Sequence, residues 1–232
     1  MPGYSARMGR YYLVRHGQAS FTAANYDQLS DLGQRQCQQL GRHWAALGVR
    51  FDAVLCGPLR RHAQSLQAIG QGLGQDLSAQ VCEGLREYDP HAVVAAVGAA
   101  LPARDHPDFY RQYIRALRQG LAAWFAGQAQ PSGLPDWPAF GQGVLDALRQ
   151  ALPQAQAPQG RVLVVTSGGP IAAALSMLWQ TPPPATVELN VQLCNASVSE
   201  LVAAPRRALA VHSFNTVAHL QAPGFEDWIS YV

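Results

Sequence analysis

The sequence predicts an α/β protein: a three-layer sandwich in which a mostly parallel central sheet lies between helices on both faces. Three short apolar runs, each followed by a turn and then by a helix-like stretch, carry this prediction. These runs are residues 10–14, 51–56 and 161–166. Successive strand–turn–helix units favour parallel strands. We expect the whole chain, residues 1–232, to form a single domain.

The first two units are recognised by their strand and helix-end signals. The first run, RYYLV, stops at a polar turn, and Ser30 can then cap a helix that Gly48 ends. The second run, FDAVLC, leads to Pro58, a residue that favours the first position of a helix. Apolar positions in that helix recur every three or four residues and predict one buried stripe, which includes His62.

The middle of the chain, residues 91–152, has a mostly helical pattern that a Pro-rich segment at 131–138 interrupts. We expect it to be a helical insertion over the end of the sheet that carries the active site. A loop rich in Pro and Gln should follow at 153–160, and the prolines at 182–184 predict a break in structure. Two further strands are expected at 197–202 and 209–214.

Composition and charge exclude several classes of function. The formal net charge is only +2 and no basic run is longer than two residues, so the sequence does not indicate a nucleic-acid partner. The longest apolar run, residues 92–101, is too short for a membrane span, and no secretory signal is evident, which predicts a cytoplasmic protein without membrane contact. The four cysteines lack metal-type spacing and predict reduced core residues, with no metal and no cofactor. A homodimer is left open.

Polar groups suited to a phosphoryl ligand follow the three strands. Arg15 and His16 follow the first, Arg61 lies after the second, and Ser167 and Gly168 follow the third. Ligands of a parallel sheet bind beyond the carboxyl ends of its strands, where helix N-termini present free N–H groups. Two guanidinium groups, an imidazole, a hydroxyl and backbone amides therefore predict one phosphate-binding pocket.

Four segments carry a resemblance to a known family. In chain order they are LVRHGQA (13–19), LSDLG (29–33), GPLRRHAQS (57–65) and LRE (85–87). They resemble motifs of the histidine phosphatase (phosphoglycerate mutase-like) superfamily, in particular of its small bacterial-type members, and the resemblance covers nearly the whole chain. It implies that His16 is phosphorylated during turnover, that Arg61 rather than Arg60 binds phosphate, and that Glu87 is the proton donor.

The sequence departs from the family pattern at two places near the expected site. Ser167 stands where the pattern has a second histidine in a His-Gly-Gly turn, and a neutral hydroxyl cannot supply positive charge. Loss of one transition-state donor costs about a hundred- to a thousand-fold in rate. His62 replaces the usual Ala, and its place on the apolar stripe predicts a structural role. The pattern after Glu87 is also altered, so Asp89 is an alternative acid.

The chemistry of these groups is consistent with phosphoryl transfer. A neutral imidazole at His16 can attack phosphorus, while Arg15 and Arg61 neutralise the charge on the equatorial oxygens. Glu87, with its pKa raised by the pocket, would protonate the leaving oxygen and later deprotonate water. Neither step needs a metal. Candidate substrate-binding residues follow the first motif: Gln18, Ser20 and Asn25.

We therefore expect a metal-independent phosphomonoester hydrolase that acts on a small phosphorylated substrate through a phosphohistidine at His16. A mutase is less favoured because residues 91–152 lack the basic cluster that a bisphosphate would need. One alternative is a catalytically impaired pseudoenzyme that binds inorganic phosphate, another phosphoryl ligand or a protein. A third is an α/β hydrolase with Ser167 as nucleophile and His212 or His219 as base, although the usual GxSxG pattern is absent.

Overall fold

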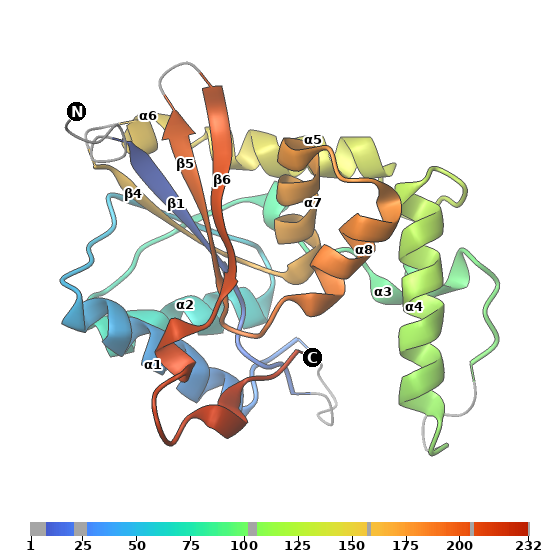
Figure 1. Ribbon diagram of the computed structural model, residues 1–232, viewed down its shortest axis with the longest axis horizontal. Helices are drawn as coiled ribbons and strands as arrows, with labels where there is room; N and C mark the ends of the chain where they lie inside the picture. Colours follow the sequence, from blue (N-terminus) through green and yellow to red (C-terminus); the bar gives the residue numbers. More distant parts are fainter. Residues whose placement is uncertain (1–7, 21–26, 102–105, 157–158, 205–206, 232) are drawn as a thin grey trace.

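The computed structural model describes residues 8–20, 27–101, 106–156, 159–204 and 207–231. Within them, six strands form one mixed sheet in the order β3-β2-β4-β1-β5-β6 (Figure 1). The strands are β1 (Gly9–Arg15), β2 (Ala53–Cys56), β3 (Gln80–Val81), β4 (Arg161–Thr166), β5 (Val198–Ala204) and β6 (Arg207–Thr216). The four strands from β3 to β1 are parallel, and β5 and β6 extend the sheet in antiparallel register. The first three expected strands are the parallel centre of the sheet.

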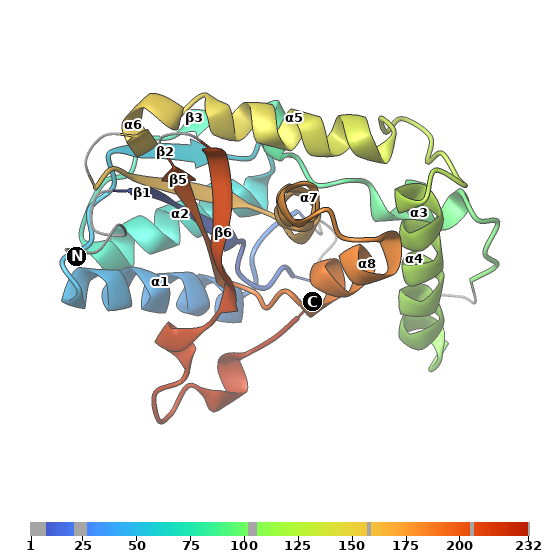
Figure 2. The ribbon, with the colours of Figure 1, turned by 45° about the horizontal axis from the view of Figure 1, so that its top comes forward.

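Helices cover both faces of this sheet, as expected (Figure 2). They are α1 (Asp31–Ala46), α2 (Arg60–Leu73), α3 (Pro90–Ala95), α4 (Phe109–Phe125), α5 (Trp137–Arg149), α6 (Leu152–Gln156), α7 (Gly168–Trp179) and α8 (Pro183–Gln192). Helices α1 and α2 lie together on one face, and α5 and α7 lie on the other. Helices α3 and α4 stand to one side, next to α8 (Figure 1). None of the described helices combines the length and the hydropathy needed to cross a membrane.

Alternating side chains of the central strands build two hydrophobic cores. Val162 and Val164 of β4 point into the core beneath α5 and α7, whereas Leu163 and Val165 point into the core beneath α1 and α2. This period of two, with both sets buried, is the pattern of a central parallel strand. The cysteines are buried and unpaired, as predicted: Cys37, Cys56, Cys82 and Cys194.

The start of α2 differs from the prediction. The helix begins at Arg60 rather than at Pro58, and Leu59 before it is extended, with ψ at 149°. The carboxylate of Asp27 accepts the backbone N–H groups of Arg60 at 2.9 Å and Arg61 at 3.4 Å. A residue distant in the sequence therefore caps this helix, which starts two residues after the predicted position.

Two other proline-rich segments also differ from their predicted roles. The break expected at 182–184 does separate α7 from α8, but Pro183 already opens α8, because the first turn of a helix needs no N–H donors. The predicted loop at 153–160 contains most of α6, where the pattern was too short to predict a helix. The interruption expected at 131–138 does separate α4 from α5, although Pro138 already lies in the first turn of α5.

Candidate active site

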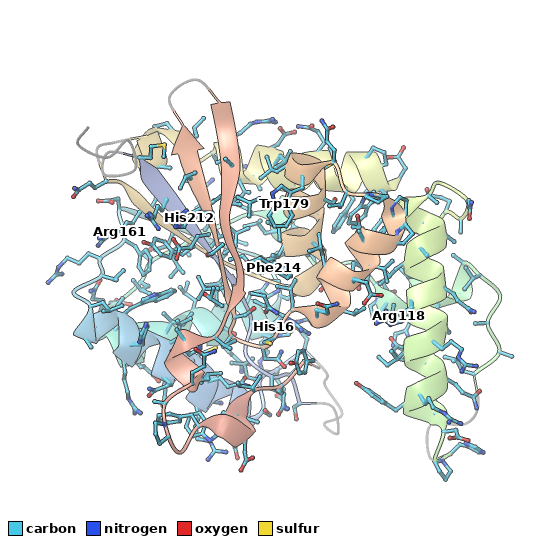
Figure 3. All side chains as sticks on the ribbon, viewed as in Figure 1. His16, Arg118, Arg161, Trp179, His212 and Phe214 are labelled. Carbon is cyan, nitrogen blue, oxygen red and sulfur yellow. The ribbon has the colours of Figure 1, made fainter. Side chains whose placement is uncertain are left out.

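His16 follows β1 at the carboxyl end of the parallel strands and is only 5 % exposed (Figure 3). Its backbone N–H donates to the carbonyl oxygen of Thr166 at 2.8 Å, which ties it to the end of β4. The Nδ1 atom lies 2.7 Å from the carbonyl oxygen of Gly17. Because a carbonyl can only accept, this contact assigns the proton to Nδ1 and the lone pair to Nε2.

The electrostatic surroundings keep this imidazole neutral. Burial lowers the pKa of His16 well below its usual 6.5, and the positive charges of Arg61 and Arg15 lower it further. A neutral ring with its lone pair on Nε2 is the form that can act as a nucleophile.

Arg61, in the first turn of α2, reaches the same nitrogen. Its Nε donates to His16 Nε2 at 3.2 Å, and its terminal nitrogen contacts Asp27 Oδ1 at 3.1 Å. Asp27 thus caps α2 and orients the guanidinium with the same carboxylate. Sequence reasoning missed Asp27, because no local signal relates it to a helix that starts 33 residues later.

The side chain of Arg15 is held by the C-terminal part of the chain. Its terminal nitrogen donates to the carbonyl oxygens of Leu193 and Tyr231, the latter at 2.6 Å. An added Cβ at Gly168 would lie 3.8 Å from Arg15 Nε, so this guanidinium borders the turn between β4 and α7. Arg15 and Gly168 therefore come together, as the predicted pocket requires.

Ser167 lies in that turn, fully buried, and its partner is an unexpected histidine. Its Oγ is 2.6 Å from Nε2 of His62, and the His62 ring centroid lies 5.8 Å from that of His16. His62 is buried, as the apolar stripe predicted, but the prediction of a purely structural role did not foresee its contact with the site. The helical period identifies the buried face of α2, but it does not identify the residues that this face contacts.

The histidines proposed as bases for Ser167 lie elsewhere. His212 is exposed on β6, and His219 is buried with its ring centroid 6.4 Å from that of His43. Neither makes the contact that His62 makes. Ser167 therefore does not pair with either expected base.

Glu87 joins the site from the segment that follows β3. Its carboxylate accepts the backbone N–H of Gly169 at 3.2 Å and that of Tyr88 at 3.1 Å. Burial raises the pKa of Glu87, whereas the charge of Arg61 lowers it. The alternative acid, Asp89, is exposed and caps α3 by accepting the N–H of His91 at 2.8 Å. The structure thus favours Glu87 over Asp89 at the pocket.

Two residues that the sequence reasoning did not single out support the His16 turn. Ser65 Oγ accepts the N–H of Gly17 at 3.1 Å and donates to the carbonyl oxygen of Arg61 at 2.8 Å. Asn195 Nδ2 donates to the carbonyl oxygen of His16 at 3.4 Å. Ser65 is the last residue of the segment 57–65, and the resemblance of that segment to a family motif was the available signal.

The three candidate substrate-binding residues are less closely tied to this site. The side-chain oxygen of Gln18 accepts the hydroxyl of Ser30 at 2.8 Å, and the backbone N–H of Ser20 donates to Gln28 at 2.8 Å. Asn25 lies outside the described residues. Substrate contacts by Gln18 and Ser20 stay a prediction. Among the residues that the structure describes, no group of three or more His, Cys, Asp or Glu side chains is placed to hold a metal ion.

Comparisons with known proteins show the family to which the chain belongs. The family model described as "Histidine phosphatase superfamily (branch 1)" matches residues 11–216. No curated protein sequence matches the chain.

Three solved structures illustrate the likeness of fold. A phosphoserine phosphatase from Entamoeba histolytica is 16 % identical, with 91 % of this chain and 98 % of that chain covered and a TM-score of 0.64. A phosphoglycerate mutase from Bacillus anthracis is 20 % identical, with coverages of 92 % and 96 % and a TM-score of 0.63. A mycobacterial glucosyl-3-phosphoglycerate phosphatase is 20 % identical, with coverages of 90 % and 100 % and a TM-score of 0.65.

At such identities the structures establish the fold alone, whereas the family model covers most of the chain and includes the His16 motif. The chain belongs to the histidine phosphatase superfamily, branch 1.

Proposed function

We propose that the protein is a phosphomonoesterase that transfers the phosphoryl group of a small substrate first to His16 and then to water. Membership of the superfamily supports a phosphatase- or mutase-type activity. The observation that carries the finer proposal is the state of His16. The contact between Nδ1 and Gly17 leaves a lone pair on Nε2, and Arg61 lies within hydrogen-bond distance of that atom.

In the first step, Nε2 of His16 attacks phosphorus and the bond from phosphorus to the leaving oxygen breaks. Arg61 must release Nε2 for this attack and can then donate to an equatorial phosphoryl oxygen. Arg15 supplies a second positive charge that helps to neutralise the equatorial phosphoryl oxygens. Glu87, whose raised pKa favours the protonated form, gives its proton to the leaving oxygen.

In the second step, water attacks phosphorus and the bond to Nε2 breaks. The carboxylate of Glu87 accepts the proton of the attacking water and so returns to its starting state. Inorganic phosphate leaves, and His16 is neutral again. Water as the final acceptor makes the protein a hydrolase.

The likeness to other structures suggests probes. The mycobacterial phosphatase has been crystallised with inorganic phosphate and with VO3, and a mutant of the Entamoeba phosphatase with phosphoserine. By analogy we choose p-nitrophenyl phosphate as a general substrate, phosphoserine as an alkyl phosphate, and vanadate as a mimic of the transition state. Vanadate should bind more tightly than phosphate if the site is complementary to five-coordinate phosphorus.

The test is the covalent intermediate. The wild-type chain, quenched during turnover, should carry one phosphoryl group that is labile in acid and stable in alkali, as expected for a phosphohistidine. His16→Ala should lose this group, and its kcat/KM should fall by more than about a thousandfold. Excess EDTA should leave the wild-type rate unchanged.

His212→Ala is the matched control, because His212 is an exposed histidine on β6. It should keep both the intermediate and the rate. A wild-type chain that binds phosphate and vanadate but never forms the intermediate would instead support the binding protein. Labelling of Ser167 by a fluorophosphonate, with no label on His16, would support the serine hydrolase.

A further inference from the structure

The contact between His62 and Ser167 joins two elements that are distant in the sequence. His62 lies in the first turn of α2 and Ser167 lies between β4 and α7, 105 residues later. Both side chains are fully buried, and the 2.6 Å separation of Nε2 and Oγ is that of a short hydrogen bond. Because the ring centroids of His16 and His62 lie 5.8 Å apart, the pair of His62 and Ser167 lies next to the proposed nucleophile.

Ser167 does not use its hydroxyl as a serine in this position normally does. It occupies the N-cap position of α7, where a serine side chain ordinarily accepts an N–H of the first turn. The Ser167 side chain makes no such capping bond within the described chain, and the N–H of Gly169 donates to Glu87 instead. The hydroxyl is thereby left to pair with His62.

The neighbouring backbone is shaped around the imidazole. A Cβ atom at Gly57 would lie 2.2 Å from His62 Nδ1 and 2.7 Å from its Cε1, so any side chain at that position would displace the ring. Gly57 directly follows β2, and its own N–H donates to the carbonyl oxygen of Val165 of β4 at 2.9 Å. The ring is therefore held between the ends of two central strands.

The environment also selects the proton position on His62. The ring is neutral, because burial and the charge of Arg61 lower its pKa to about 3. Nδ1 lies against the Gly57 backbone, which favours the protonated ring, but the contact lacks the alignment of a full hydrogen bond. A buried N–H without an acceptor is less tolerable than a bare lone pair, so the proton belongs on Nε2, where Ser167 Oγ can accept it.

We propose that His62 is a positioning residue of the phosphoryl site, and that it acts through Ser167. Its Nε2–H donates to Ser167 Oγ, so the hydroxyl hydrogen of Ser167 turns away from His62 and donates to a phosphoryl oxygen on His16. The pair supplies one neutral, oriented donor in place of a positive charge. This inference rests on the proposed phosphatase function.

A double-mutant cycle on the full chain tests the pair. Ser167→Ala removes the donor and should lower kcat/KM for p-nitrophenyl phosphate by about a hundredfold to a thousandfold. His62→Met only disorients the donor and should lower kcat/KM by a smaller factor. The double variant should be no slower than the slower single variant. Vanadate affinity should fall with the rate, whereas phosphate affinity should fall less.

Two further variants separate positioning from packing. Gln at position 62 is as long as Met but can place an amide N–H near the imidazole Nε2, so His62→Gln should recover most of the rate that His62→Met loses. His219→Ala removes another buried histidine, whose ring lies beside that of His43 rather than that of His16, and should reduce stability without changing kcat/KM. Equal losses for Gln and Met would overturn the positioning role, as would independent, multiplying effects in the double variant.

The outcomes also distinguish the two proposals. If the wild-type chain turns over and His62→Met is unaffected, the pair fails while the phosphatase function stands. If the wild-type chain forms no phosphohistidine, the proposed phosphatase function fails, and the proposed role of His62 and Ser167 fails with it. Covalent labelling of Ser167 that depends on His62 would assign the opposite proton position and overturn the inference.

Discussion

Burial acts on His16 and Glu87 in opposite directions. It lowers the pKa of the imidazole and raises that of the carboxyl group, because both shifts favour the neutral form. The result is a neutral imidazole whose Nε2 lone pair accepts from Arg61, and an acid that keeps its proton to a higher pH than an ordinary glutamate. Two groups whose pKa values are moved apart in this way have the roles of base and acid that phosphoryl transfer needs.

Glu87→Gln tests the acid role through the leaving group. Phosphoserine needs a proton on its leaving oxygen, so the variant should hydrolyse it about a hundredfold more slowly or worse. p-Nitrophenolate leaves without help, so rapid mixing should show a burst of one product per chain and then a slow phase limited by attack of water. As the pH rises above the raised pKa of Glu87, the wild-type chain loses this proton, and its hydrolysis of phosphoserine should slow toward the rate of Glu87→Gln.

Asp89→Asn is the control for that experiment, because Asp89 caps α3 and is exposed. It should keep wild-type kinetics on both substrates. Two results would contradict the assignment of the acid: a burst of p-nitrophenolate in Asp89→Asn, or an equal slowing of the first phosphoryl transfer from both substrates in Glu87→Gln.

At the scale of elements, α1 and α2 approach closely because glycines lie at their contact. A Cβ atom at Gly41 would lie 2.2 Å from the carbonyl oxygen of Ile69, and one at Gly72 would lie 2.0 Å from that of Gln38. Backbone atoms cannot rotate away, so added side chains would push the helices apart. This packing matters for function because α2 carries Arg61 and His62 at its N-terminus.

Gly41→Ala should therefore lower the free energy of unfolding by about 1–3 kcal/mol, measured by urea denaturation. Gly143→Ala is the matched substitution, since Gly143 lies within α5 and an added Cβ there meets nothing within 4 Å. It should raise the free energy of unfolding by up to about 1 kcal/mol, because alanine is the better helix former. A similar gain in both variants would indicate that helix propensity, not contact between the helices, decides the outcome.

Helices and strands were predictable where the apolar pattern of a segment agrees with the capping or turn residues at its ends. β1, β4 and α1 follow their apolar patterns, and Ser30 caps α1 as expected by accepting the N–H of Gly33 at 3.1 Å. The two-residue β3 was missed because so short a strand has no period. Helix α8 was missed because a triple proline is an ambiguous signal that can end one element or begin the next.

At the scale of the whole molecule, three histidines are buried in the neutral form. The pKa of His16 lies well below 6.5, and those of His62 and His219 are lowered to about 3, in each case chiefly by burial. The unfolded chain binds protons at these residues below pH 6.5, whereas the folded chain does not. Folding stability therefore falls as pH falls through this range.

Each such histidine contributes a slope of up to about 1.4 kcal/mol per pH unit to the free energy of unfolding. Glu87 has the opposite sign, because its raised pKa makes the folded chain bind a proton that the unfolded chain has lost. His219→Gln isolates one histidine, whose ring lies beside that of His43, and should reduce the slope by about 1.4 kcal/mol per pH unit between about pH 6 and 5. Urea denaturation at several pH values measures this slope, and an unchanged slope would show that His219 titrates normally when folded.

The sequence by itself determined the α/β class, the parallel centre of the sheet and the residues at the ends of β1 and β4. Periodic burial and turn chemistry are local properties, so they can be read along the chain. Only the tertiary structure decided that Asp27 orients Arg61, that C-terminal carbonyls hold Arg15, and that His62 meets Ser167. Those contacts depend on how α2 lies against β4 and on where the C-terminal part of the chain lies relative to β1. No local sequence pattern encodes either arrangement.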